Sequence, residues 1–169
     1  GVLTLQNGLG NYETISEIVP QARVTAGTST FGATLLDEGH VREAGHGFVQ
    51  LGSPTDNHRR AREAANYLKS AGIDTQPASS VDDVLWAKAT VNASINPLTA
   101  LTGLRNGTLV EIDPLRELMN AVTREVADIA RSCGIFMQEG IVKSVEGICR
   151  ETAENRSSML QDISAGRRT

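Results

Sequence analysis

The sequence is poor in aromatic residues and cysteine, and it contains no long apolar run. Only 4% of its 169 residues are aromatic, so Leu, Val, Ile and Ala must fill any core. The two cysteines, Cys133 and Cys149, match no zinc-ligand spacing and are too few for a disulfide framework, which favours free thiols in a reducing compartment. No apolar stretch approaches the roughly 20 residues that a membrane-spanning helix needs. These absences predict a soluble, cytoplasmic protein with no membrane partner.

Positive charge is also in short supply. The chain has 16 basic and 20 acidic residues, a net charge of −4, whereas nucleic-acid binders usually carry a basic face. We therefore expect no nucleic-acid partner. The chain has no initiator Met and opens directly on the apolar run Gly1–Leu5. Because a natural start usually has polar residues before a core strand, this favours a piece of a longer protein.

Strand and helix signals alternate in the first 79 residues. Strands are expected at the apolar run 2–5 and at 73–78. The strands 23–36 and 40–51 are expected to form a hairpin around the turn Asp37-Glu38-Gly39. Helices are expected at 11–19, capped by Asn11, and from a cap at Asp56 or Asn57 to Ala71. This alternation is typical of the second half of an α/β nucleotide-binding domain, so residues 1–79 are predicted to be a partial Rossmann-like domain.

The remaining residues, 80–169, carry almost no strand signal. Helices are predicted at 81–95, where Pro97 ends the pattern, at 113–133, opened by Asp113-Pro114, at 138–152, and from Asn155 onward. The predicted fold class is therefore α/β plus all-α, with an all-helical second domain.

Three polar residues share one side of the helix predicted at 81–95. Lys88, Asn92 and Asn96 follow one another at intervals of four, so they drift by only about 40° per step and form one polar stripe. The rest of that helix is largely apolar and should be buried, and buried polar groups need partners. A ligand is one such partner, and a buried lysine has a lowered pKa that suits proton transfer. In the alternative interpretation Lys88 reaches solvent and the amides cap neighbouring helices.

The same segment resembles a family signature. The string from Leu85 to Ala100 is similar to the L-W-x-K-x-x-x-N-x-x-x-N-P-L-[ST]-A pattern of ketopantoate reductases. Three further strings follow the family order: Leu5-Gln6-Asn7-Gly8 resembles its L-Q-N-G turn, the segment from Gly107 lies where the family has an N-G-x-L loop, and 154–163 resembles E-N-x-S-S-M-x-Q-D. The resemblance covers essentially the whole chain, and it implies a helical domain like that of 6-phosphogluconate dehydrogenases.

The resemblance implies a function and a role for each matching residue. The activity would be the NADPH-dependent reduction of 2-dehydropantoate (ketopantoate) to pantoate in pantothenate and coenzyme A biosynthesis, in a cleft between the two domains. Lys88 would be the general acid, and Asn92 and Asn96 would hold the hydroxyl and carboxylate region of the substrate. Ser158 would bind the substrate carboxylate, and Asn7 would lie beside the nicotinamide ribose. The resemblance implies no metal and leaves a homodimer open.

The sequence departs from the family pattern in two places. It contains no G-x-G-x-x-G loop for the cofactor pyrophosphate, and a glutamate that the family uses would follow Thr169. We therefore expect the 169 residues to be inactive alone. These residues do not decide whether the cofactor is NADPH or NADH. Two other functions stay open: a related reductase of another 2-oxo acid, or a non-catalytic helical binding or assembly module.

Overall fold

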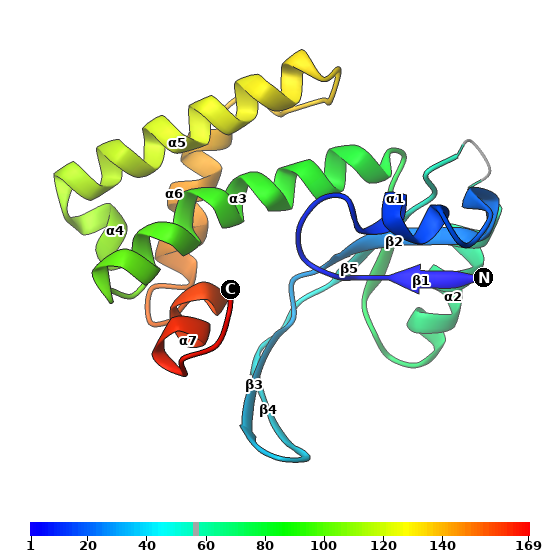
Figure 1. Cartoon of the computed structure of the whole chain (residues 1–169), viewed down its shortest axis with the longest axis horizontal. Helices are drawn as coiled ribbons and strands as arrows, with labels where there is room; N and C mark the ends of the chain where they lie inside the picture. Colours follow the sequence, from blue (N-terminus) through cyan, green and yellow to red (C-terminus); the bar gives the residue numbers. More distant parts are fainter. Residues whose placement is uncertain (56–57) are drawn as a thin grey trace. The chain divides into compact units, whose positions relative to one another are not determined.

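The computed structural model describes residues 1–55 and 58–169, which form two compact units, 1–85 and 86–169 (Figure 1). The caps expected at Asp56 or Asn57 lie outside the described residues. Each unit has its own core. Within the described residues, no helix is both long and apolar enough to span a bilayer.

The first unit is built on a mixed four-stranded sheet of order β1-β2-β5-β6. β1 pairs with β2 in parallel, β2 with β5 antiparallel, and β5 with β6 in parallel. The elements are β1 (Val2–Thr4), α1 (Asn11–Ser16), β2 (Val24–Ser29), β3 (Gly32–Asp37), β4 (His40–Gly45), β5 (Val49–Gly52), α2 (Arg59–Ser70) and β6 (Thr75–Pro77), with a 3-10 turn at Gln21–Arg23. Apart from the hairpin described next, this agrees with the predicted alternation of strands and helices.

The predicted long hairpin is divided between two sheets. β2 and β5 belong to the four-stranded sheet, while β3 and β4 form a separate two-stranded sheet with register shifts. The turn after Asp37 lies where it was predicted, and Gly39 has a φ of 74° that favours glycine. At the base of the hairpin, the Thr30 amide donates to the Phe48 carbonyl (3.0 Å) and the Phe48 amide donates to Thr30 Oγ1 (2.9 Å).

α1 differs from its prediction at both ends. Gly10, not Asn11, is the residue before the helix, and the Asn11 side chain instead donates back to the Asn7 carbonyl (3.1 Å). The helix ends at Ser16 rather than Val19. Its Tyr12 packs in a core with Val24 and Ala26, and Tyr12 Oη donates to Asp82 Oδ1 (2.7 Å).

The second unit contains only helices. They are α3 (Val81–Thr102), which begins within the first unit, α4 (Thr108–Glu111), α5 (Asp113–Ser132), α6 (Ile141–Glu151) and α7 (Ser158–Ser164). The main core joins residues from four helices, with Leu109, Met119, Val145 and Cys149 fully buried. Burying each of the Leu, Met and Val side chains contributes about 1.5–3 kcal/mol, so this core stabilises the unit.

The second unit differs from the prediction at α3 and at α4. α3 does not stop before Pro97 but continues to Thr102, and the single turn α4 was not predicted. Pro97 has no N–H to donate to the carbonyl of Ala93, and its ring crowds that carbonyl, so a proline inside a helix costs about 3 kcal/mol. Leu98 and Thr99, directly after the proline, are 7% and 0% exposed, so burial offsets that loss.

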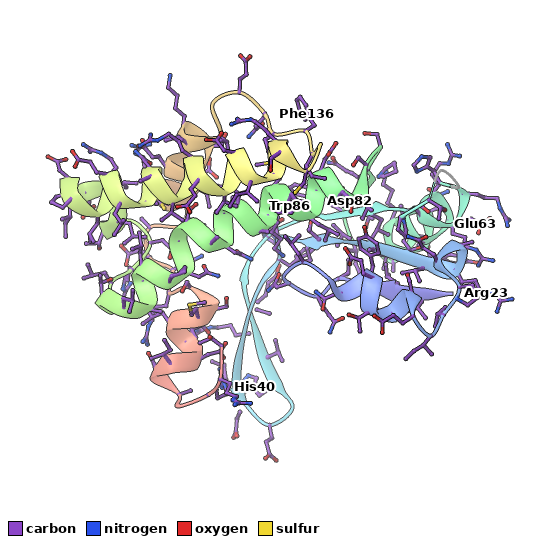
Figure 2. All side chains as sticks on the ribbon, turned by 45° about the horizontal axis from the view of Figure 1, so that its top comes forward. Arg23, His40, Glu63, Asp82, Trp86 and Phe136 are labelled. Carbon is purple, nitrogen blue, oxygen red and sulfur yellow. The ribbon has the colours of Figure 1, made fainter. Side chains whose placement is uncertain are left out.

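A smaller core lies beside the start of α3. Ala127, Ala130, Met137 and Ile141 are buried together, and Trp86 packs against them. Trp86 and the exposed Phe136 are labelled in Figure 2. The small alanines of α5 leave room for the indole, which explains why the single tryptophan lies here.

Candidate active site

The predicted polar stripe lies on α3, at the border between core and surface. Lys88, Asn92 and Asn96 are each half-buried. The opposite side of the helix carries Thr90 and Ser94, which are fully buried. With a rise of about 1.5 Å per residue, the eight-residue step from Lys88 to Asn96 spans about 12 Å along the axis, the length of a small organic acid and its contacts.

Burial changes the acidity of the stripe's only charged group. The pKa of Lys88 is lowered from its ordinary value of 10.5 because desolvation disfavours the ammonium form. A lysine with a lowered pKa exchanges a proton more readily near neutral pH, which suits a general acid.

The fold brings Asn96 and Ser158 together although 62 residues separate them. Asn96 Nδ2 donates to Ser158 Oγ over 3.4 Å. Ser158 is exposed and is the first residue of α7. An amide and a hydroxyl therefore stand side by side at a partly open position, where both can donate to an anionic oxygen.

Two buried hydroxyls lie next to this pair. Ser157 caps α7 by accepting a hydrogen bond from the Leu160 amide (3.1 Å), and its Oγ is 2.7 Å from Thr99 Oγ1. Thr99 Oγ1 also donates to the Asn96 carbonyl (2.9 Å). The sequence prediction began this helix at Asn155 and assigned no role to Ser157 or Thr99. A serine directly before a short amphipathic run is an N-cap signal that could have located Ser157.

The segment before α7 is held by the loop that precedes α4. The amides of Asn106 and Gly107 donate to the carbonyls of Asn155 and Ala153 (both 3.1 Å), and Asn106 Nδ2 donates to Thr152 Oγ1 (2.9 Å). A Cβ on Gly107 would lie 2.6 Å from that of Ala153. The close approach requires glycine at this position, which accounts for the N-G string.

Asn7 belongs to the first unit, whereas the other four predicted site residues belong to the second. It is exposed in the turn after β1, at the carboxyl end of the strand, where α/β sheets bind ligands. Gly8 follows with a φ of 94°, which favours glycine.

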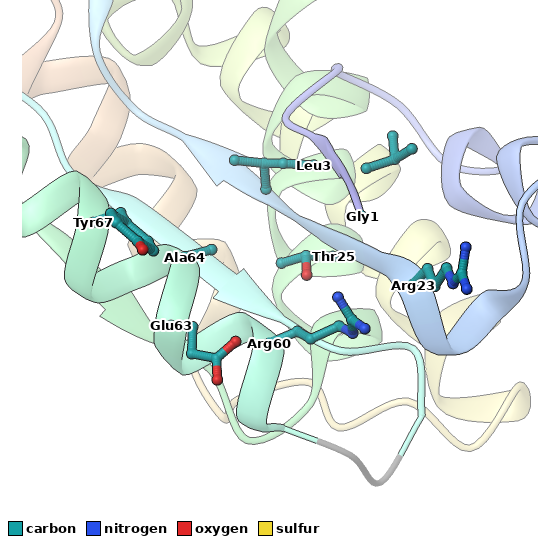
Figure 3. A pocket seen from close by; sticks show the side chains of 9 residues that line it. Gly1, Leu3, Arg23, Thr25, Arg60, Glu63, Ala64 and Tyr67 are labelled. Carbon is teal, nitrogen blue, oxygen red and sulfur yellow. The ribbon is translucent and has the colours of Figure 1, made fainter.

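The first unit also has a surface hollow that contains none of the predicted site residues. A shallow hollow in the first unit is lined by residues of β1, β2 and α2, among them Leu3, Arg60 and Tyr67 (Figure 3). Within the described ranges, no three His, Cys, Asp or Glu residues gather as a metal site.

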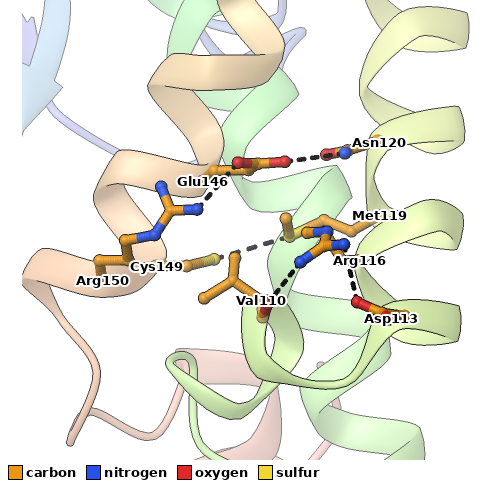
Figure 4. Close-up of polar contacts among 8 residues, drawn as sticks. All are labelled: Val110, Asp113, Arg116, Met119, Asn120, Glu146, Cys149 and Arg150. Atoms are coloured by element: carbon orange, nitrogen blue, oxygen red, sulfur yellow. Dashed lines mark hydrogen bonds and ion pairs between the residues drawn. The ribbon is translucent and has the colours of Figure 1, made fainter.

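Polar contacts between α5 and α6 are structural (Figure 4). Asn120 Nδ2 donates to Glu146 Oε1 (2.9 Å), and Arg150 pairs with Glu146 Oε2 (3.0 Å). The Asn120 hydrogen bond, followed by that of Arg150, lowers the pKa of Glu146. The Glu146 carboxylate therefore stays charged, and its partners Asn120 and Arg150 both belong to the second unit.

Comparison with known proteins places these observations in a family. The family model described as "Ketopantoate reductase PanE/ApbA C terminal" matches residues 80–169, and "Ketopantoate reductase PanE/ApbA" matches residues 1–56. The chain belongs to the ketopantoate reductase family. The stripe of α3 and the Asn96–Ser158 pair both lie in the part matched by the first of these.

Curated members of the ketopantoate reductase family align along the whole chain. The 2-dehydropantoate 2-reductases of Halobacterium salinarum and Archaeoglobus fulgidus are each 37% identical over 169 residues. These alignments cover 99% of this chain and 56% of each relative, so the chain spans about half the length of the curated relatives it matches.

Solved structures confirm the predicted fold class. A 2-dehydropantoate 2-reductase from Geobacter metallireducens has a TM-score of 0.93 at 28% identity, covering 99% of this chain and 56% of that one. A D-mandelate dehydrogenase in complex with NADH has a TM-score of 0.90 at 25% identity, covering 99% and 58%. The predicted combination of an α/β part and a helical part is therefore correct.

Proposed function

We propose that this chain carries the substrate side of a reductase that converts 2-dehydropantoate to pantoate with NADPH. The observation that supports this most is the placement of a half-buried lysine on the same helix as an amide that contacts Ser158. The curated relatives are 2-dehydropantoate 2-reductases, which supports the choice of substrate.

In the proposed reaction the residues of the second unit bind and protonate the substrate. The Ser158 hydroxyl and the Asn96 amide donate hydrogen bonds to the carboxylate region, and Asn92 holds the substrate hydroxyl region. The Lys88 ammonium faces the ketone oxygen, stabilises the negative charge that develops there and donates its proton. The lowered pKa of Lys88 eases that donation, and the anionic substrate helps to keep the amine protonated.

The residues present fit only part of the cofactor. The exposed Asn7 at the carboxyl end of β1 would contact the nicotinamide ribose, whereas no G-x-G-x-x-G string for the pyrophosphate occurs in the 169 residues. NADPH, when bound, would supply the hydride that reduces the ketone carbon. We accordingly propose that these 169 residues alone support no turnover.

A related reductase of another 2-oxo acid is the second candidate. The structural likeness to a D-mandelate dehydrogenase in complex with NADH supports it. Mandelate is a different 2-hydroxy acid from pantoate, and NADH lacks the 2′-phosphate of NADPH. Substrate and cofactor must therefore be tested together.

The test is an assay of the product of the complete reading frame that contains these residues. NADPH and NADH oxidation are followed with ketopantoate, benzoylformate and pyruvate, and the 169-residue chain is assayed in parallel. Highest kcat/KM with ketopantoate and NADPH supports the proposal, and preference for benzoylformate supports the second candidate. If no 2-oxo acid is reduced, the reductase proposal is wrong and a non-catalytic module becomes the better description.

Substituting the lysine tests the mechanism. Lys88→Ala should lower kcat/KM by about 10²–10⁴-fold, the usual contribution of a positioned general acid. Lys69→Ala, which removes an exposed lysine at the end of α2, is the matched control and should leave turnover unchanged. Equal turnover in both variants would exclude Lys88 as the acid.

A further inference from the structure

The family signatures contain two residues to which no role in substrate binding has been given. Thr99 lies at the [ST] position of the α3 string, and Ser157 is the first serine of the string before α7. Both are hydroxyl residues, and both are buried, at 0% and 7% exposure. A buried hydroxyl is retained at little cost only where it has hydrogen-bond partners.

The partners of Thr99 and Ser157 form one continuous chain between two helices. The Leu160 amide donates to Ser157 Oγ, the two hydroxyls lie 2.7 Å apart, and Thr99 Oγ1 donates to the Asn96 carbonyl. Each hydroxyl has a single proton. The Thr99 proton goes to the Asn96 carbonyl, so the Ser157 proton is the one that joins Ser157 to Thr99. The chain thus joins the backbone of Asn96 on α3 to the first turn of α7.

Both ends of this hydrogen-bond chain are attached to proposed substrate-binding residues. Asn96 provides the carbonyl at one end, and Ser158 directly follows Ser157 at the other. The side chains of Asn96 and Ser158 are joined by a single exposed hydrogen bond of 3.4 Å. A hydrogen bond of this length is weak and cannot by itself hold two helices in register. The buried pair lies one residue away and has the shorter, better shielded contact.

We propose that Thr99 and Ser157 are positioning residues that hold Asn96 and Ser158 at the spacing needed to bind the substrate carboxylate. This inference rests on the proposed function. The two hydroxyls do not touch the substrate, and their effect reaches it through the placement of their neighbours.

A second buried hydroxyl pair on α3 provides a matched control. Thr123 Oγ1 of α5 lies 2.8 Å from Ser94 Oγ, and both residues are fully buried. Thr123 also donates to a carbonyl of its own helix, as Thr99 does. Ser94 lies on the side of α3 opposite the polar stripe, so this pair joins two helices without reaching the site.

The experiment compares Thr99→Val, Thr99→Ser and Thr123→Val in the product of the complete reading frame, by kinetics and thermal unfolding. Thr99→Val should raise KM for the 2-oxo acid about tenfold with kcat nearly unchanged, because it weakens ground-state and transition-state binding alike. Thr99→Ser keeps the hydroxyl and should restore KM to within about twofold of wild type. Thr123→Val should lower Tm to a similar extent and leave KM unchanged.

Coupling to Ser158 is tested in the Ser158→Ala background. If Thr99 acts by placing that side chain, Thr99→Val should raise KM by less there than in the wild type. Equal increases of KM in Thr99→Val and Thr123→Val, with turnover present, would overturn the positioning role and leave the reductase proposal intact.

A crystal structure of Thr99→Val separates this inference from the proposed function. The positioning role predicts that Asn96 and Ser158 move apart relative to the wild type. If they keep their separation, the inference is overturned whether or not the enzyme reduces a 2-oxo acid. Absence of turnover in the wild type would instead count against the proposed function.

Discussion

Gly107→Ala and Gly147→Ala are the same chemical change, yet the structure predicts opposite effects on stability. A Cβ at Gly107 would lie 2.6 Å from the Cβ of Ala153 and 2.9 Å from its Cα. Carbon atoms in good contact are about 3.5–4.0 Å apart, so the overlap is about 1 Å against atoms that no rotamer change can move. Gly147, inside α6, has nothing within 4 Å of such a Cβ.

The magnitudes follow from these contacts. Overpacking of this kind costs about 1–3 kcal/mol. The backbone of Gly107 is helical (φ −58°, ψ −37°), so alanine recovers about 0.4–1 kcal/mol by restricting the unfolded chain. The net expectation is a loss of up to about 2.6 kcal/mol for Gly107→Ala, against a gain of about 0.5–1 kcal/mol for Gly147→Ala in a helix interior.

The assay is urea unfolding of the 169-residue chain followed by far-UV circular dichroism, with thermal unfolding as a second measure. At about 2–4 °C per kcal/mol for a chain of this size, the two variants should differ in Tm by several degrees. A raised stability of Gly107→Ala, like that expected of Gly147→Ala, would refute the close packing of this loop against Ala153. It would also weaken the argument that the loop holds the segment leading to Ser158.

Two further predictions concern ionisation. Since burial lowers the pKa of Lys88 below 10.5, the unfolded chain binds more protons between the two values, and the free energy of unfolding should rise with pH in that window. In urea titrations from about pH 8 to about pH 10, the free energy of unfolding of the wild type should rise relative to that of Lys88→Met. If the two free energies change in parallel with pH, the burial of the amine is contradicted. Burial raises the pKa of the Cys149 thiol to about 11, whereas Cys133 is exposed. A thiol reagent should therefore modify one cysteine in the native chain and both in urea, and Cys133→Ser should abolish the native reaction; rapid native labelling of Cys149 would refute its placement.

Helical periodicity in the sequence was a reliable guide where one face of a helix is apolar. The predicted helix at 113–133 agrees with α5 to within one residue. Local signals failed where tertiary contacts decide the outcome. Pro97 predicted a helix end, but the burial of Leu98 and Thr99 carries α3 past it. The stretch 23–36 has strand composition throughout, and composition alone could not show that it serves two sheets.

The candidate site was predictable only in part, for a similar reason. A period of four residues is enough to align Lys88, Asn92 and Asn96, because it depends on one helix alone. The contact between Asn96 and Ser158 depends on how α7 docks on α3, and no spacing along the sequence contains that information. The resemblance gave a role to Asn96 and Ser158, but it gave none to Thr99 and Ser157, whose positions the family strings also contain.

The small hairpin of β3 and β4 has a consequence for the dynamics of the first unit. A two-stranded sheet is marginally stable in water, so its amide protons should exchange through local opening rather than through global unfolding. The hydrogen bonds between Thr30 and Phe48 close its base, where it leaves β2 and β5. Hydrogen exchange should consequently divide at Thr30, with fast exchange beyond it and slow exchange in the four-stranded sheet. The hairpin can thus change its conformation at low energetic cost while the strand that leads to Asn7 keeps its place.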